Sequence, residues 1–248
     1  MRDDLLEALA AVDWTVSQLP AFEERIRSWL NDNVYVAIVE TELPATHDVM
    51  VARERCQLPL DFNIEAGVYI NVLRSSLDIL ATAIGKREMV LNPDSIYFPV
   101  TRSADIFATG NYKGSEFVRQ LSRGSRDIIE AYQPYHRGNE AVGMIHDLDN
   151  MRKHRRLLAV LVRPAMWHVR GWGLGDTFKP LERFPASIEP GKGDTPLGEL
   201  LKGGPEPDVQ FTPHIVFAQR TPAFGFPVVR AIKGFANKAA EIVRAFDF

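Results

Sequence analysis

Residues 140–158 read EAVGMIHDLDNMRKHRRLL, and their apolar side chains recur at the spacing of an α-helix with one buried face. The side chains on that stripe are Ala141, Met144, Ile145, Leu148, Met151, Arg155 and Leu158. Asp147, Asn150 and His154 lie beside the stripe. Because a buried polar group without a partner costs roughly 1–3 kcal/mol, this pattern predicts a polar site whose partners come from another element.

A second amphipathic segment, at about residues 64–84, is the element that we expect to supply those partners. Its apolar seam alternates at spacings of four and three, and consists of Ala66, Ile70, Leu73, Leu77, Leu80 and Ile84. Asn71, Arg74 and Asp78 lie on its flank, and Gly85 is the expected C-cap. If the two segments pack antiparallel, their polar side chains should meet near the middle of each helix.

The rest of the chain mixes helical and extended patterns. Further helices are expected at residues 4–30, with an interruption at Pro20, and at 115–131 and 227–246. Strands are expected at 34–43 and 47–58, which form a hairpin, and at 159–163, 166–170 and 209–219, while residues 176–208 read as a long loop. This grouping predicts an α+β fold in which about five helices form a layer on a mostly antiparallel sheet. We expect a single domain spanning residues 1–248.

Composition excludes several classes of protein. The 248 residues carry a formal net charge of −3, unlike a dedicated DNA-binding protein, which is strongly basic. A single cysteine, Cys56, precludes an intramolecular disulfide and favours a reducing compartment. The first residues carry acids where a signal peptide has basic residues, and no apolar run approaches the roughly 18 residues of a membrane span. The expected location is therefore cytoplasmic, without a membrane partner.

Two interpretations of the polar side chains remain open. In the first, they form a rigid network in a binding or structural module, with Asn71, Arg74, Asn150 and Arg155 able to hold an anionic ligand. In the second, the protein is a metal-independent enzyme. His154 would then be its general acid or base, oriented by Asp147 or Asp78.

No cofactor or metal is expected. His146 and His154 lie two helical turns apart, about 12 Å, which is too far to share one ion. The acidic run at 147–151 lacks the EF-hand spacing, and the glycines at 171–175 do not form a phosphate-binding loop. The basic run at 152–156 leaves RNA as a partner, beside a small anionic ligand or a second copy of the chain.

Three short motifs resemble those of a family of bacterial and phage-encoded proteins that has no settled activity. They are LRSSLDIL at 73–80, QPY at 133–135 and NMRKHR at 150–155, the last matching the family's N-x-x-K-H-R. Ile79 stands where that family more commonly has His. This resemblance implies positions of interest and no particular reaction.

A looser resemblance is to HEPN domains, helical bundles that often cleave RNA without a metal through a closely spaced Arg and His. Arg163 and His168 match that spacing. However, Pro164 and the β-rich surroundings differ from the helix start at which the motif belongs. The resemblance implies an RNA-cleaving alternative, for which His154 is the candidate.

Overall fold

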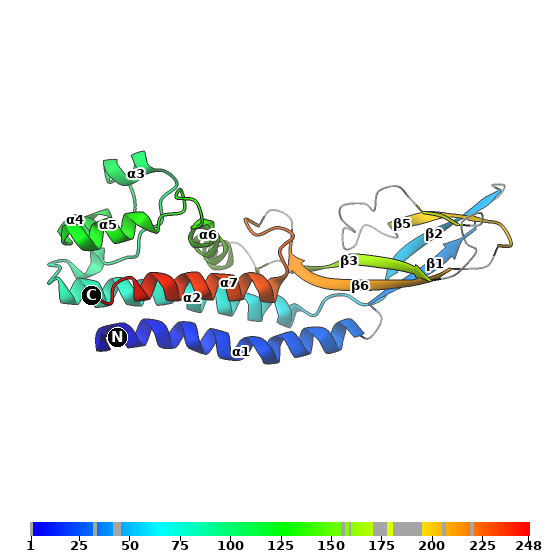
Figure 1. Ribbon diagram of the computed structural model, residues 1–248, viewed down its shortest axis with the longest axis horizontal. Coiled ribbons are helices and arrows are strands. Elements are labelled where there is room, and N and C mark those ends of the chain that lie inside the picture. The colour runs from blue at the N-terminus through cyan, green and yellow to red at the C-terminus, as the bar shows by residue number, and fades with distance from the viewer. Residues whose placement is uncertain are drawn as a thin grey trace. The chain divides into compact units, whose positions relative to one another are not determined.

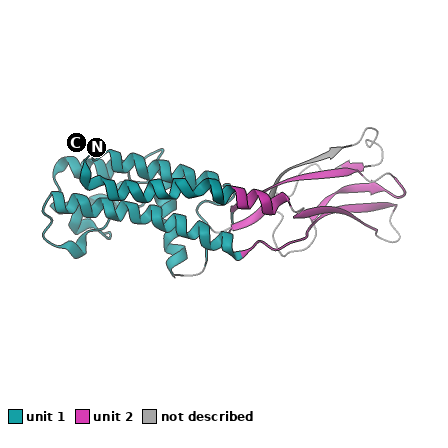
Figure 2. Cartoon of the chain, turned by 90° about the horizontal axis from the view of Figure 1, so that it is seen from below, with its two compact units in different colours: residues 1–23, 60–159, 217–248 teal, residues 24–59, 160–216 magenta. Residues whose placement is uncertain are grey.

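The computed structural model describes residues 2–31, 34–41, 46–154, 157–158, 160–170, 178–180, 195–204, 207–218 and 221–248, with only the backbone for 154, 163–170 and 180. The chain divides into two compact units, each described by itself below (Figure 2). Unit 1 comprises residues 1–23, 60–159 and 217–248, and unit 2 comprises 24–59 and 160–216. The expectation of a single domain stays a prediction.

Unit 1 is helical (Figure 1). Its longer helices are α1 (Leu6–Asn31, of which residues up to Glu23 belong to unit 1), α2 (Leu60–Arg87), α6 (Glu140–His154) and α7 (Val228–Arg244). Its short elements are η1 (Asp3–Leu5), η2 (Pro93–Ser95), α3 (Ala104–Thr109), α4 (Ser115–Gln120) and α5 (Arg123–Ala131).

The described residues thus contain seven α-helices, more than the five or so expected. One extra helix is α3, which lies in a segment for which no helix was expected. The other arises because the helix expected at 115–131 is broken. Leu121 is extended there, and the Ser122 side chain accepts a hydrogen bond from the Ser125 backbone and begins α5.

The centre of unit 1 is α2, which packs against both α6 and α7. The apolar seam expected on α2 is confirmed, because Ala66, Ile70, Leu73, Leu77, Leu80 and Ile84 are all fully buried. The helix is longer than expected at both ends, and Gly85 is not its cap. A Cβ at Gly85 would lie 2.6 Å from Ile96 Cδ1, so this glycine permits close packing inside the helix.

Pro20 does not interrupt α1, contrary to expectation. A proline inside a helix costs about 3 kcal/mol, so burial has to offset this cost. Phe22, two residues further on, is fully buried and packs edge-on against Phe62 and Tyr69 of α2. Burial of a Phe side chain contributes about 1.5–3 kcal/mol, and Leu19 is buried beside it.

Unit 2 carries the strands β1 (Tyr35–Glu40), β2 (His47–Glu54), β3 (Val160–Arg170), β4 (Phe178–Pro180), β5 (Thr195–Leu201) and β6 (Asp208–Phe217, whose last residue belongs to unit 1). Four of them form a sheet in the order β1-β2-β5-β4, with antiparallel pairing throughout, and β3 pairs with β6. The expected hairpin is confirmed as β1–β2. The α+β class is confirmed as well.

Two expectations about the prolines of unit 2 are wrong. β3 runs straight through Pro164, where the sequence suggests two strands. β4 and β5 fall within the segment read as a loop. The prolines of that segment obscure an apolar pattern, since Phe178, Leu197 and Leu200 are buried on these strands.

Candidate functional site

Arg74, near the middle of α2, is the most deeply buried charge of the described chain, with 1% of its surface exposed. Its Nη2 donates a hydrogen bond of 2.9 Å to the Phe98 carbonyl oxygen. Its Nη1 lies 3.0 Å from Asp78 Oδ1, one helical turn away. The guanidinium also stacks over the Tyr97 ring, with 4.4 Å from Cζ to the ring centroid. Arg74 therefore fastens residues 97–98 to α2.

Asp78 takes part in the same fastening, because its Oδ1 also accepts a 3.1 Å hydrogen bond from the Phe98 backbone N–H. About a third of this side chain is exposed. Burial of the rest raises the pKa of Asp78, against the opposing effects of Arg74, the Phe98 N–H and Lys153. The carboxylate is thus held by partners within unit 1.

Asp149 carries the contact between the two helices that the sequence pairs. Only 2% of its side chain is exposed, and its Oδ1 accepts a 3.0 Å hydrogen bond from Asn71 Nδ2 on α2. Lys153 Nζ lies 2.5 Å from the other carboxylate oxygen, and Arg152 Nη2 lies 3.6 Å from Oδ1. The expected meeting of α2 and α6 is confirmed, but the hydrogen bond between them joins Asn71, expected as a ligand-binding residue, to Asp149, which was not singled out.

The two helices run antiparallel. Asn63 Nδ2 donates to the Leu158 carbonyl just beyond α6, and a Cβ at Gly67 would lie 2.9 Å from Arg152 Cδ. Together with the Asn71–Asp149 hydrogen bond, these contacts pair the N-terminal part of α2 with the C-terminal end of α6, so that residue numbers rise along one helix as they fall along the other. The absence of a side chain at Gly67 leaves room for the Arg152 stem.

Asp147 lies on another side of α6 and pairs with Arg102, a residue from the segment that follows Tyr97. Arg102 Nη2 lies 2.6 Å and 2.8 Å from the two carboxylate oxygens of Asp147. The Arg102 side chain is 73% exposed, whereas that of Asp147 is 21% exposed. Asp147 is thus engaged with a cation at the surface. Because the side chain of His154 lies outside the described residues, its expected orientation by Asp147 stays a prediction.

His146 directly precedes Asp147 on α6 and is partly buried. Its Nε2 is 2.9 Å from Asn150 Nδ2, one turn along α6. Burial lowers the pKa of His146, and the nearby charges of Arg74 and Arg102 lower it further, against Asp147 and Asp149. The imidazole is therefore neutral at pH 7. If Nε2 accepts from the Asn150 amide, Nδ1 carries the proton, and this buried atom has no hydrogen-bond partner among the described residues.

We call these side chains the polar cluster: Asn71, Arg74, Asp78, Tyr97, Arg102, His146, Asp147, Asp149, Asn150, Arg152 and Lys153. The structure brings together six of the residues singled out in the sequence, but in separate pairs: Asn71, Arg74, Asp78, His146, Asp147 and Asn150. Two others lie outside the part that is described, namely Arg155 and the side chain of His154. The expected contact of Asp78 with the Arg155–His154 pair therefore stays a prediction.

Gln133 holds segment 96–102 in place, a role that the sequence analysis did not assign to it. Gln133, of the QPY motif, is fully buried and satisfies all its hydrogen-bonding atoms. Its Oε1 accepts from the backbone N–H and the hydroxyl of Thr101, and its Nε2 donates to the carbonyls of Pro99 and Ile129. The motif thus has a structural role here. Its signal in the sequence was a polar residue directly before a proline.

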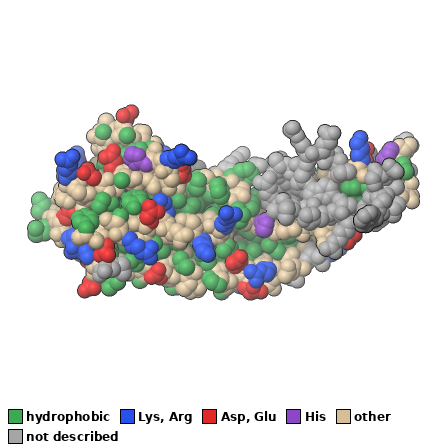
Figure 3. Space-filling model, viewed as in Figure 1, with side chains coloured by type: hydrophobic (Ala, Val, Ile, Leu, Met, Phe, Trp, Pro, Cys, Tyr) green, Lys and Arg blue, Asp and Glu red, His purple; other side chains and the backbone are tan. Residues whose placement is uncertain are grey.

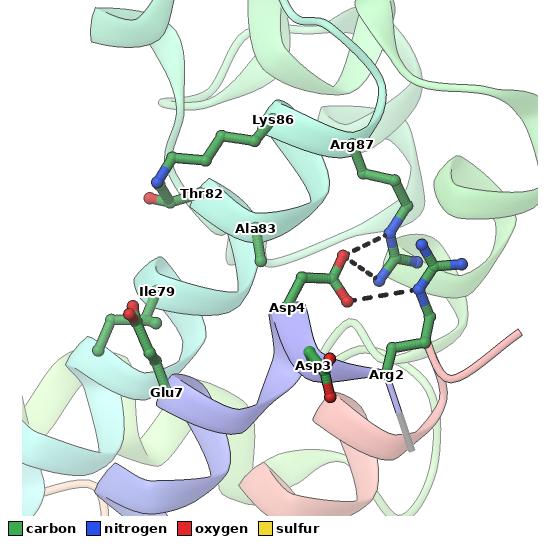
Figure 4. Close-up of a pocket in the computed structure, with 9 residues that line it drawn as sticks. All are labelled: Arg2, Asp3, Asp4, Glu7, Ile79, Thr82, Ala83, Lys86 and Arg87. Atoms are coloured by element: carbon green, nitrogen blue, oxygen red, sulfur yellow. Dashed lines mark hydrogen bonds and ion pairs between the residues drawn. The ribbon is translucent and has the colours of Figure 1, made fainter.

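A cleft of about 490 Å³ lies elsewhere on unit 1, between the start of the chain and the end of α2 (Figure 4). Asp4 in its wall accepts hydrogen bonds from both Arg2 and Arg87. Ile79, which stands where the resembling family more often has His, also lines this cleft. The Asp4 carboxylate and the Arg2 and Arg87 guanidinium groups are therefore already paired with one another.

The described residues lack a metal-binding cluster and a helix that could span a membrane. They contain no group of three or more His, Cys, Asp or Glu placed to hold a metal ion. None of the described helices is long and apolar enough to cross a bilayer. On the face shown in Figure 3, basic and acidic side chains are interspersed and do not gather into one basic patch.

Comparison with models of known protein families, with curated proteins and with solved structures found no match for this chain. The resemblances to the phage-encoded family and to HEPN domains therefore stay predictions.

Proposed function

We propose that this protein is a non-catalytic binding or structural module. In this proposal the interior of the polar cluster holds α2, segment 96–102 and α6 in one arrangement, and its outer cations contact an anionic ligand. A cytoplasmic location, expected from the single cysteine, is part of the same proposal.

The burial of Arg74 is the observation that carries the proposal. The residue is 1% exposed, and its guanidinium already engages a carbonyl, a carboxylate and an aromatic ring. A ligand or substrate would have to displace these partners to reach it. Such buried ionic networks fix an arrangement more reliably than they add stability, which supports a structural role for the interior.

The outer cations differ from Arg74 in their exposure. Arg102 and Lys153 have side chains that are 73% and 44% exposed, although they pair with Asp147 and Asp149. An anion could approach them from solvent without breaking the internal contacts of Arg74. We therefore place the anionic ligand at this rim.

A binding assay with two anions tests the proposal. Pyrophosphate and a short single-stranded RNA would be titrated into the full chain at low salt by calorimetry. The variants are Arg102→Gln, Lys153→Gln and the matched control Arg123→Gln, which removes a 90% exposed arginine that also faces an aspartate, from α5. We expect binding of at least one probe to weaken threefold or more with the first two variants and to be unchanged with the third.

Two outcomes would overturn the proposal. If neither probe binds, or if the control weakens binding as much as the rim variants, the rim is not an anion site. If the wild-type chain cleaves RNA in the presence of a metal chelator, and His154→Ala abolishes cleavage without unfolding the protein, the chain is an acid–base ribonuclease instead.

A further inference from the structure

A second cleft in unit 1, of about 600 Å³, lies between the first turns of α6, the first half of α7 and the turn that precedes α7. Sites for small molecules usually have volumes of about 300–1,000 Å³. None of the residues of the polar cluster lines this cleft. We call it the α6–α7 cleft.

The walls of the α6–α7 cleft are largely apolar. Met144 of α6, Phe235 of α7 and Phe226 of the preceding turn line it. Phe226 is 53% exposed, so its ring is open to contact with a bound molecule. Gly234 adds to the space, because a Cβ built there would meet no atom within 4 Å. These features provide a surface for the apolar part of a ligand.

One cation at this cleft, Arg230, has a side chain without a partner among the residues that the structure describes. Arg230 lies in the first turn of α7 and is exposed, and its side chain forms no hydrogen bond or ion pair with any other described residue. Lys238, two turns further along the same face, is already paired. Its Nζ lies 2.7 Å from Glu241 Oε2 and donates to Asn139 Oδ1 at 3.3 Å.

The acid of the cleft does not neutralise Arg230. Glu140 accepts a 3.1 Å hydrogen bond from the Gly138 backbone N–H. Backbone hydrogen bonds at this helix start lower the pKa of Glu140, so it stays ionised and serves the N-terminus of α6. The first turn of α7 has no acidic residue, and Pro227 gives it no side-chain cap. The positive end of α7 therefore adds to the charge of Arg230.

We propose that the α6–α7 cleft binds a small carboxylate with an apolar body. The carboxylate pairs with Arg230, since guanidinium and carboxylate groups can form two parallel hydrogen bonds. The apolar body packs against Met144, Phe226 and Phe235. This site is separate from the polar cluster and does not depend on the anion rim proposed above.

Decanoate is a suitable probe, used below the concentration at which it forms micelles. Titration into the full chain would be followed by calorimetry, with decanol and decylammonium as neutral and cationic analogues of the same length. We expect saturable binding of decanoate, and binding of either analogue at least tenfold weaker. Equal binding of all three would mean a general affinity for apolar chains and would overturn the proposal, as would no binding of decanoate.

Variants locate the site. Arg230→Gln should weaken decanoate binding about tenfold, whereas Arg244→Gln, which removes an exposed arginine at the far end of α7, should leave it unchanged. Gly234→Leu should abolish binding by filling the cleft, and Gly234→Ala should reduce it less. Circular dichroism of each variant checks that α7 is intact. Binding that survives Gly234→Leu in a folded chain would place decanoate elsewhere and overturn the proposal.

Discussion

Replacement of Arg74 by Met should destabilise unit 1 more than any other single change in the polar cluster. Met keeps the length and the apolar stem of Arg74 but removes the guanidinium. The Phe98 carbonyl then loses its 2.9 Å donor, and the Asp78 carboxylate loses the cation at 3.0 Å. The Tyr97 ring also loses the charge that stacks on it.

The expected magnitude follows from how far each stranded group can regain water. Removal of one partner of a buried ion pair costs about 3–5 kcal/mol. Asp78 is 35% exposed and keeps its hydrogen bond from the Phe98 N–H, so part of its charge is rehydrated or stays bonded. The free energy of unfolding should therefore fall by about 3 kcal/mol, the lower end of that range, out of a typical total of about 5–15 kcal/mol.

Urea unfolding followed by far-ultraviolet circular dichroism measures this loss. Arg74→Lys is the matched control for charge: a lysine keeps the cation but cannot reproduce the planar fork that reaches Phe98 and Asp78 together. It should recover only part of the loss. The double variant Arg74→Met with Asp78→Asn should be more stable than Arg74→Met alone, because no carboxylate is left unpaired. A loss below about 1 kcal/mol for Arg74→Met would refute the reasoning, since typical surface substitutions cost about that or less.

Three further predictions concern neighbouring features. Because the pKa of His146 is lowered in the folded chain, the unfolded chain binds the proton first as the pH falls below about 6.5. The free energy of unfolding of the wild type, measured in urea, should therefore fall from pH 7 towards pH 5, and His146→Gln should reduce this fall. Equal slopes for the two proteins would contradict the prediction. Gln133→Met should lower the free energy of unfolding by about 2–4 kcal/mol in the same measurement, since buried backbone groups lose the hydrogen bonds that Gln133 now makes with them. An unchanged stability would mean that water replaces the Gln133 amide. Gly85→Ala should lower the thermal midpoint of unfolding, because its Cβ would lie 2.6 Å from Ile96 Cδ1. Gly234→Ala adds a Cβ in open space and should raise the midpoint, since alanine favours a helix over glycine by about 0.5–1 kcal/mol. A shift of the same sign for both variants would show that Ile96 moves aside freely.

The pairing of α2 with α6 could be predicted because both helices carry periodic apolar side chains. The seam of α2 is buried as expected, and Asn71 reaches α6. The face of α6 is rotated from the predicted stripe: Val142, Ile145, Leu148 and Asp149 are its buried residues, while Met144 and Met151 are only half-buried. The prediction extended the helical period to Leu158, but α6 ends at His154. Ile145, Leu148 and Leu158 of the predicted stripe are buried as expected, whereas the stripe omits Val142 and Asp149, which are buried as well.

The partners supplied by segment 96–102 could not be predicted in the same way. This segment has no regular spacing, and its position depends on backbone groups that any residue could offer. The Phe98 carbonyl binds Arg74, and the Phe98 N–H binds Asp78. A sequence specifies such contacts only through the side chains that reach them, and Arg74, Asp78 and Gln133 all lie on other elements. Arg102 is brought to Asp147 as a consequence of where these three hold the segment.

The contrast between Arg74 and Arg230 indicates where a ligand can gain binding energy. Both are arginines on long helices of unit 1. A ligand that reached Arg74 would have to break a hydrogen bond and an ion pair inside the protein and would leave Asp78 without its cation. A ligand at Arg230 displaces only water from the guanidinium and gains contact with an exposed Phe226. The net gain is therefore larger at Arg230, which has no side-chain partner among the described residues, than at Arg74, whose partners lie inside the protein.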